Sequence, residues 1–310
     1  MGIYVYLLLI TITIDLTLLI GRLFNIISTP INGNIHFFSG LIIVLAVFGL
    51  CSYGNYHANQ IKNVSYDIQI PKKMLNDNLR IIMLSDLHLG YTNDVAYLKK
   101  VVDRINSMEP DIVCIVGDIF NGSYHALVDA GKAEGLMRGI QSTYGVYASL
   151  GNHDAGPTYN EMISFFEKSE ITLLNDENTI IADQIVLVGR KDSSPIGGQG
   201  EERTSISDQL AQIQSDLPII VMDHQPSNIS EYSGIVDLIL SGHTHKGQIF
   251  PASLITKAIY EVDYGYYQKE QDSPQVIVTS GIGTWGPPMR IGTDSEIVEI
   301  LINPLSSAVD

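Results

Sequence analysis

The chain has 310 residues, of which 45% are hydrophobic, and its 34 acidic and 18 basic side chains give a formal net charge of −16. This composition excludes a disordered chain, which would lack the apolar residues, and argues against a nucleic-acid partner, whose phosphates bind basic surfaces. Two cysteines are too few for a disulfide-rich scaffold. Residues 1–61 carry only Asp15 and Arg22 as charges. The chain therefore divides into a nearly uncharged front and an acidic body.

The front contains two apolar runs, residues 3–20 and 37–53. Because a helix needs about 20 apolar residues to cross a hydrocarbon core of about 30 Å, the first run is long enough and the second is slightly short. Asp15 is the only charge inside them, and the connector contains turn formers such as Pro30 and Gly33. We therefore expect a transmembrane helical hairpin and a multi-pass location in the cell membrane.

Two other interpretations of the front stay open at this point. One is a single anchor followed by an interfacial segment. The other is a cleaved signal peptide, although no basic residue precedes Ile3 and no small-residue cleavage motif directly follows Ile20. With the hairpin, we expect residues 1–61 to form the membrane anchor and residues 62–310 the second domain. By the positive-inside rule, the few flanking basic residues favour a cytoplasmic body; they are Arg22, Lys62, Lys72, Lys73 and Arg80.

The body alternates short β-branched runs with amphipathic stretches, which is typical of an α/β fold. The expected strands are residues 64–70, 79–84, 111–116, 146–150, two near 178–188, 218–222 and 236–240. The expected helices are residues 94–108, 126–140, 159–167 and 205–214. A final group of expected strands has no helix between its members, which are residues 248–250, 275–279 and 296–302. The pattern predicts a mixed sheet or two stacked sheets.

Polar side chains follow five of the expected strands. Residues 79–84 lead into Asp86 and His88, which in an extended chain point to the same side. The other four strands end in Asp118, in Asn152, His153 and Asp154, in His224, and in His243 and His245. Ligand-binding sites in α/β proteins form at the carboxyl ends of the strands. A mixture of imidazole and carboxylate ligands suits Mn, Fe, Zn or Ni. The strand ends therefore predict a metal site.

The order of these motifs, Asp-x-His, Gly-Asp, Gly-Asn-His-Asp, His and Gly-His-x-His, resembles the calcineurin-like metallophosphoesterases over about residues 79–302. The segments around Asp86, His224 and His243, together with residues 281–290, are similar to the bacterial membrane-associated subgroup. The resemblance implies a four-layer α/β/β/α sandwich, in which two mixed sheets are flanked by helices, and the transmembrane hairpin precedes it here.

The resemblance also implies two divalent ions per chain, with Mn²⁺ favoured over Fe²⁺/Fe³⁺, Zn²⁺ and Ni²⁺. It assigns to the first ion Asp86, His88, Asp118 and His245. It assigns to the second ion Asp118, Asn152, His224 and His243, with Asp118 bridging. A hydroxide that bridges the two ions would attack the phosphorus in line. His153 would protonate the leaving oxygen with Asp154 orienting its ring, and Trp285 and Arg290 are hypothetical substrate contacts.

The sequence thus predicts a membrane-anchored phosphoesterase acting on phosphodiesters, monoesters or pyrophosphates. An alternative is a lipid-linked pyrophosphatase acting on a UDP-acylated sugar, which the anchor and the subgroup both suggest. A net charge of −16 offers an anionic headgroup little attraction beyond the metals themselves. A hypothesis of another class is a non-catalytic metal-binding scaffold, against which the complete set of expected ligands argues.

Overall fold

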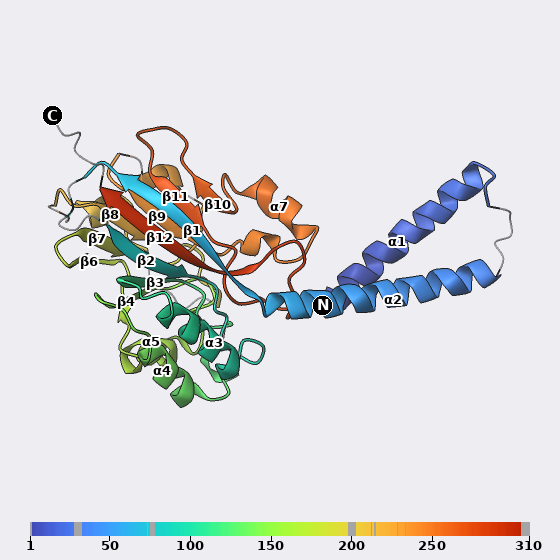
Figure 1. Ribbon diagram of the computed structural model, residues 1–310, viewed down its shortest axis with the longest axis horizontal. Coiled ribbons are helices and arrows are strands. Elements are labelled where there is room, and N and C mark those ends of the chain that lie inside the picture. The colour runs from blue at the N-terminus through green and yellow to red at the C-terminus, as the bar shows by residue number, and fades with distance from the viewer. Residues whose placement is uncertain are drawn as a thin grey trace.

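The two N-terminal helices form a hairpin outside the body of the protein. The computed structural model describes residues 2–27, 33–72, 74, 78–197, 203–211, 213, 215–227, 229–232 and 234–304. Helices α1 (Gly2–Leu23) and α2 (Gly33–Ala58) are long and apolar enough to cross a membrane, and they extend from one side of the body (Figure 1). Gly33 begins α2 and does not lie in a turn. The connector residue Pro30 lies outside the described residues.

The hairpin joins the body through a short junction. Only residues 59–60 separate the end of α2 from strand β1 (Ile61–Ile70). The Ser295 hydroxyl donates a 2.8 Å hydrogen bond to the carbonyl of Ala58, the last residue of α2. Apolar side chains of both helices pack against the body in a buried cluster formed by Tyr6, Val47 and Met289. The hairpin and the body are therefore in direct side-chain contact.

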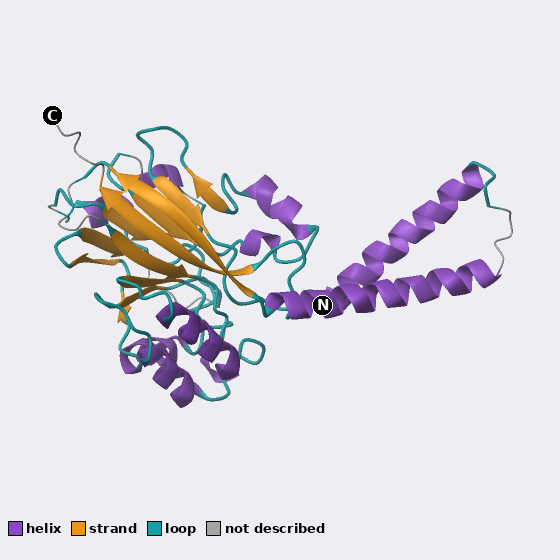
Figure 2. Cartoon of the chain, in the orientation of Figure 1, coloured by secondary structure: helices purple, strands orange, loops and turns teal. Residues whose placement is uncertain are grey.

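The body contains two six-stranded sheets (Figure 2). The first has the order β1-β12-β2-β3-β4-β5; its further strands are β12 (Ser295–Pro304), β2 (Leu79–Leu84), β3 (Ile112–Val116), β4 (Val146–Ser149) and β5 (Thr172–Leu173). The second has the order β10-β11-β9-β8-β7-β6; its strands are β10 (Gly265–Tyr267), β11 (Gln275–Val278), β9 (Leu238–Ser241), β8 (Ile219–Met222), β7 (Ile185–Gly189) and β6 (Glu177–Ile181). Both sheets are mixed, because β12 is antiparallel to β2 and β6 to β7.

Strand β2 shows how the layers form. Ile82 and Leu84 pack on the face covered by three helices, which are α3 (Val95–Asn106), α4 (Ala130–Arg138) and α5 (Tyr159–Lys168). Ile81 and Met83 point to the other face and pack in the core between the two sheets. A strand covered on both faces is mostly apolar, as β2 is apart from the half-buried Arg80. Helix α6 (Ile206–Leu210) covers the second sheet, so the expected four-layer α/β/β/α sandwich is confirmed.

The final group of expected strands is partly wrong. Residues 248–250 form no strand, and Ile249 makes only an isolated bridge to Ile291. Pro251 follows directly and has no N–H to continue a ladder. An eight-residue helix, α7 (Ala252–Ile259), lies inside the group where no helix was expected. Strands β5 and β10 were not expected either, and the helices expected at 126–140 and 205–214 are shorter, although residues 212 and 214 lie outside the described part.

Candidate metal centre

The polar residues that follow the strands meet at one edge of the two sheets. Their backbone is unusual, because five candidate ligands have a left-handed conformation; they are Asp86 (φ 58°), His88 (44°), Asp118 (52°), His243 (68°) and His245 (49°). The expectation that the first two lie in an extended chain is therefore wrong. Non-glycine residues seldom adopt positive φ, and such strained positions cluster at functional sites.

The first group of candidate ligands is Asp86, His88 and His245, whose ligand atoms lie within 4.8 Å of one another. The Nε2 atoms of the two imidazoles are 3.1 Å apart. Oδ1 of Asp86 is 3.9 Å from Nε2 of His88 and 3.3 Å from Nε2 of His245. All three residues are buried. Three ligand atoms of this kind converging on one point fit a divalent cation.

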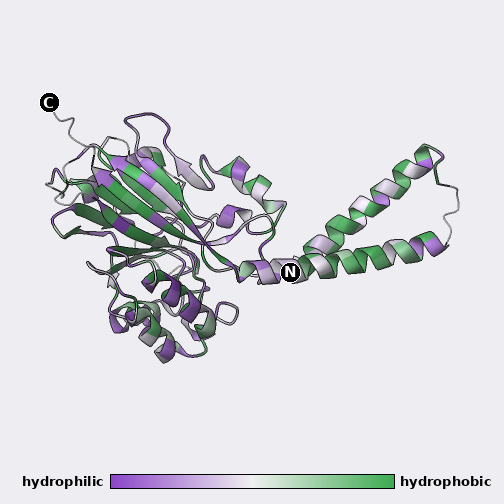
Figure 3. Cartoon of the chain, viewed as in Figure 1, coloured by the Kyte–Doolittle hydropathy of each residue, from purple (hydrophilic) through white to green (hydrophobic). Residues whose placement is uncertain are grey.

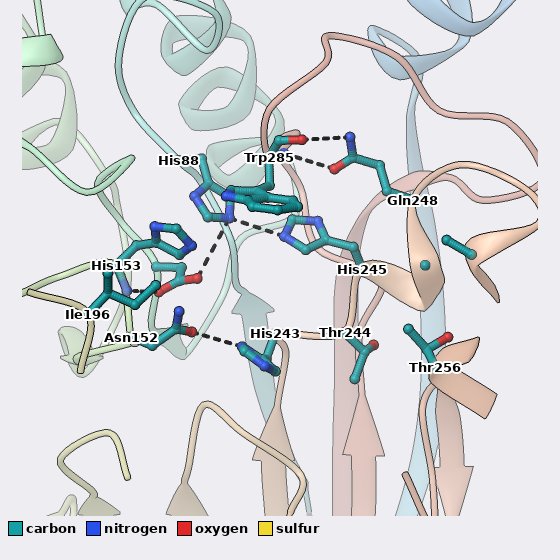
Figure 4. Close-up of a pocket in the computed structure, with 13 residues that line it drawn as sticks. His88, Asn152, His153, Ile196, His243, Thr244, His245, Gln248, Thr256 and Trp285 are labelled. Atoms are coloured by element: carbon teal, nitrogen blue, oxygen red, sulfur yellow. Dashed lines mark hydrogen bonds and ion pairs between the residues drawn. The ribbon is translucent and has the colours of Figure 1, made fainter. Parts of the chain in front are cut away.

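The second group is Asp118, His224 and His243. Oδ2 of Asp118 lies 3.2 Å from Nε2 of His224 and 3.7 Å from Nε2 of His88, so this carboxylate stands between the two groups. Oδ1 of Asn152 lies 2.8 Å from Nδ1 of His243 (Figure 4). The structure thus brings all seven candidate ligands together, six of them in two groups of three and Asn152 beside His243.

The contacts of His224 fit a bound cation. Its Nδ1 lies 2.9 Å from the carbonyl of Val116, so Nδ1 carries the proton that is donated there. Its buried Nε2 makes no hydrogen bond in the described structure and faces Oδ2 of Asp118. In the neutral ring, a lone pair then faces a carboxylate oxygen at hydrogen-bond distance, which is repulsive unless a metal ion binds both atoms or a proton lies between them.

The electrostatics of the site also favour a cation. Burial acts to lower the pKa of His224, but the charges of Asp118 and Asp86 outweigh it and raise that pKa above its usual value. Burial lowers the pKa of His88 to about 3 and that of His243 to about 4. These two imidazoles are therefore neutral at pH 7 and keep a lone pair for a metal.

Glycines allow the strand ends to approach each other closely. A Cβ atom on Gly242 would overlap the hydroxyl of Ser85 and meet the carboxylate of Asp86. A Cβ atom on Gly151 would overlap the carboxylate and the backbone nitrogen of Asp118. Only a residue without a side chain fits at these two places, which explains the glycines that precede His243 and Asn152 in the motifs.

A cavity of about 370 Å³ opens over the two groups of ligands. His153 lines it, and its ring lies edge to face with the ring of His88, with 5.1 Å between the centroids. Trp285, which is half exposed, also lies near His153, with 6.1 Å between the ring centroids, and Figure 4 draws it on the same side of His153 as His88. The backbone N–H of His153 donates a 2.8 Å hydrogen bond to Asp118. His153 is thus held at the cavity wall, beside the candidate ligands.

The expected role of Asp154 is wrong. Its buried carboxylate accepts three backbone hydrogen bonds, from Ile119 (3.1 Å), Phe120 (2.8 Å) and Gly151 (2.9 Å), and none from the ring of His153 in the described structure. Burial raises the pKa of this carboxyl to about 7, and the charge of Asp118 acts in the same direction. Asp154 therefore holds two strand-end loops together and does not orient the imidazole.

The hypothesis that Arg290 contacts substrate is also wrong, because its side chain is fully buried. Its guanidinium donates to the carbonyls of Ser280 (2.8 Å), Gly281 (3.1 Å) and Gly283 (2.6 Å). That glycine-rich loop packs against Asp86, since a Cβ atom on Gly281 would lie 2.8 Å from the Cβ of Asp86. Arg290 thus fixes the loop behind the first group of ligands.

Replacing Arg290 by alanine should lower stability strongly. The change leaves three buried carbonyls without their donor, at about 1–3 kcal/mol each, so we expect the free energy of unfolding to fall by about 3 kcal/mol or more. Chemical denaturation of the full chain in detergent measures this loss. Arg104→Ala, on the exposed face of α3, is the matched control and should change stability little. Equal effects of the two substitutions would contradict the assigned role.

Gln248 was not among the site residues expected from the sequence. Its Oε1 accepts a 2.8 Å hydrogen bond from the N–H of Trp285, and its Nε2 donates to the carbonyls of Trp285 (2.9 Å) and Pro287 (3.1 Å). The buried amide therefore fixes the loop that carries Trp285. The only signal in the sequence was its place in the segment that follows His245.

Residues 79–247 match the family described as calcineurin-like phosphoesterase. An uncharacterized metallophosphoesterase of Campylobacter jejuni is 33% identical over 263 residues, which cover 83% of this chain and 67% of that protein. A transmembrane protein with metallophosphoesterase domain of Danio rerio is 31% identical over 280 residues, or 84% of this chain and 61% of that protein. The UDP-2,3-diacylglucosamine pyrophosphatase LpxG of Chlamydia muridarum is 23% identical over 73% of this chain and 85% of its own.

The matched region contains all seven candidate metal ligands, in order from Asp86 to His245. The chain spans less than two thirds of the length of some relatives, including 62% of a Helicobacter pylori metallophosphoesterase that is 32% identical. The family expected from the motifs is confirmed, and the chain belongs to the calcineurin-like phosphoesterases.

Proposed function

We propose that this protein is a membrane-anchored phosphoesterase that hydrolyses phosphate esters with two divalent ions. The observation that carries the proposal is the position of Asp118 between two buried groups of ligands at the floor of one cavity. Phosphodiesters, monoesters and pyrophosphates all suit such a site. Residues 1–61 serve as the anchor and residues 62–310 as the catalytic domain.

The ligands in this proposal are Asp86, His88, Asp118 and His245 for one ion, and Asp118, Asn152, His224 and His243 for the other. When bound, two divalent ions supply a Lewis acid that activates water and neutralises phosphate oxygens. Mn²⁺ is the ion that we favour. The burial of Asp86 and Asp118 supports the assignment, because two buried carboxylates need a positive partner.

His153 acts in this proposal as the acid that protonates the leaving oxygen. It lines the cavity next to His88 without belonging to either group of ligands, so its ring is free to face the substrate. The contacts of its ring with the rings of His88 and Trp285 limit how it moves. Trp285 is proposed to contact the substrate at the mouth of the cavity.

A narrower candidate is a pyrophosphatase that acts on a lipid-linked substrate such as a UDP-acylated sugar. The hairpin supports it, since both helices are candidate membrane spans. The relative of Chlamydia muridarum, whose name gives that activity, supports it at 23% identity. We place the body on the cytoplasmic side, on the strength of the basic residues near the end of the hairpin, Lys62 and Lys72.

Metal dependence tests the proposal against the non-catalytic scaffold. The full chain, purified in detergent and loaded with Mn²⁺, should hydrolyse bis-p-nitrophenyl phosphate. EDTA should lower the rate by about 10²-fold or more, because Lewis-acid stabilisation is worth several kcal/mol, and added Mn²⁺ should restore it. Circular dichroism before and after EDTA separates metal loss from unfolding. No turnover with Mn²⁺, Fe²⁺, Zn²⁺ or Ni²⁺ would favour the scaffold.

A further inference from the structure

Helix α7 presents its apolar side chains to the outside. None of its residues is buried, and Leu254, Ile255 and Ile259 are 62%, 60% and 68% exposed. Phe250, just before the helix, is 51% exposed. We call these four residues the α7 apolar face. A surface helix of a water-soluble domain turns its apolar side inward, so α7 has the opposite arrangement.

The other side of the same helix belongs to the candidate metal centre. Ala252 and Thr256 line the cavity, and α7 packs against the turn that carries His245. In a helix with about 3.6 residues per turn, these two residues lie about 160° from Leu254, whereas Ile259 lies within about 60° of both, at the edge of the α7 apolar face. The cavity-lining side of this short helix therefore adjoins the α7 apolar face.

The α7 apolar face continues the surface of the hairpin. The Tyr6 hydroxyl of α1 donates a 2.7 Å hydrogen bond to the carbonyl of Phe250. Ile249 packs against the cluster of hairpin and body residues around Val47. Figure 1 shows α7 on the side of the body from which the hairpin extends, and Figure 3 shows hydrophobic residues on both.

The charges on α7 suit a membrane surface. The chain has a net charge of −16, yet α7 contains no acidic residue and carries a single base, Lys257. Eight residues span about 12 Å, which is too short to cross a bilayer but long enough to lie in its interface. Helices of that kind bury their apolar face by about 5–10 Å at the boundary of headgroups and acyl chains.

We propose that α7, together with Phe250, is an interfacial helix that lies on the membrane entered by the hairpin. The occupant of the α7 apolar face is the lipid surface, because the face adjoins two candidate membrane spans. The cavity beside α7 then opens next to the lipid headgroups. A consequence, which rests on the proposed phosphoesterase function, is that the enzyme takes phosphate esters carried by molecules resident in the membrane.

The single tryptophan of the chain makes the contact measurable. Trp285→Phe removes it, and Ile255→Trp then places one indole on the α7 apolar face. The matched control combines Trp285→Phe with Ile180→Trp, because Ile180 is 54% exposed on β6, in the second sheet. Both full chains are reconstituted in vesicles of phosphatidylcholine and phosphatidylglycerol, with and without bromine on the acyl chains. The hairpin holds both variants on the vesicle, so only the position of the indole differs.

Bromine should quench the indole at 255 at least about threefold more than the indole at 180, because an interfacial helix brings it to the acyl chains. Ile259→Trp in the same background gives a second reading of the face if Ile255→Trp fails to fold. Equal quenching at 255 and 180 would overturn the proposal. A blue-shifted emission at 255 without quenching by bromine would also overturn it, since a second copy or another protein would then cover the face. Neither result depends on turnover.

Discussion

Asp118→Asn should abolish most of the metal-dependent hydrolysis. In the proposed mechanism this carboxylate holds both ions, and its Oδ2 lies 3.2 Å from His224 and 3.7 Å from His88. Losing the shared charge should remove several kcal/mol of stabilisation, and at about 1.4 kcal/mol per factor of ten the rate should fall by about 10³-fold. The hydrolysis of bis-p-nitrophenyl phosphate and the metal content per chain, by elemental analysis, measure the two effects together.

Asp183→Asn is the matched control for this substitution. Asp183 is exposed in the turn between β6 and β7, and its φ of 54° is close to the 52° of Asp118, so asparagine meets the same backbone conformation at both places. The control should keep its activity and its two ions. If Asp118→Asn kept full activity with two ions per chain, the assignment of this residue as the shared ligand would be wrong.

His153→Ala should act on substrates according to their leaving group. A positioned general acid contributes about 10²–10⁴-fold, so hydrolysis of an alkyl phosphate ester should slow by that factor. The p-nitrophenyl ester should slow far less, because p-nitrophenolate departs without a proton. The ratio of kcat/KM for the two esters, measured at saturating Mn²⁺, reports the difference.

The exposed His125 provides the control, since it lies outside the cavity in the short turn Tyr124–Ala126. His125→Ala should leave both esters unchanged. The metal content of His153→Ala should match that of the unmodified chain, because His153 belongs to neither group of candidate ligands. An equal loss on both esters would show that His153 does not donate the proton and acts only as a positioning residue.

The site was predictable from sequence because its residues follow strands. Strand β2 is apolar apart from Arg80 and ends in the run Ile81–Leu84, so the polar residues Asp86 and His88 directly after it indicated where the strand ends. Parallel neighbours β2, β3 and β4 bring their carboxyl ends to one edge, which the alternation of strands and helices already indicates. The spacing of Asp86 and His88 in the sequence could not predict their left-handed backbone. That conformation depends on how loops far apart in the chain pack together.

The roles of other residues could not be predicted, because they depend on contacts between residues far apart in the sequence. Arg290 looks like a substrate ligand in a loop of glycines, but the fold buries it against the carbonyls of residues 280–283. Asp154 is adjacent to His153, yet it turns to backbone N–H groups of another loop. Helix α7 was not predicted, and the structure turns its apolar residues Leu254, Ile255 and Ile259 away from the core.

The junction of hairpin and body has a mechanical consequence. Two residues, 59–60, connect α2 to β1, and β1 pairs with β12 over ten residues. Nε2 of His57 lies 2.8 Å from Oδ1 of Asp294, just before β12, so the last turn of α2 is clamped to the sheet. A body joined to the hairpin by a long linker would move through a range of distances from the bilayer. The short, clamped junction holds this body close to the hairpin. In the proposed function, only phosphates at a set distance from the bilayer would then reach the cavity.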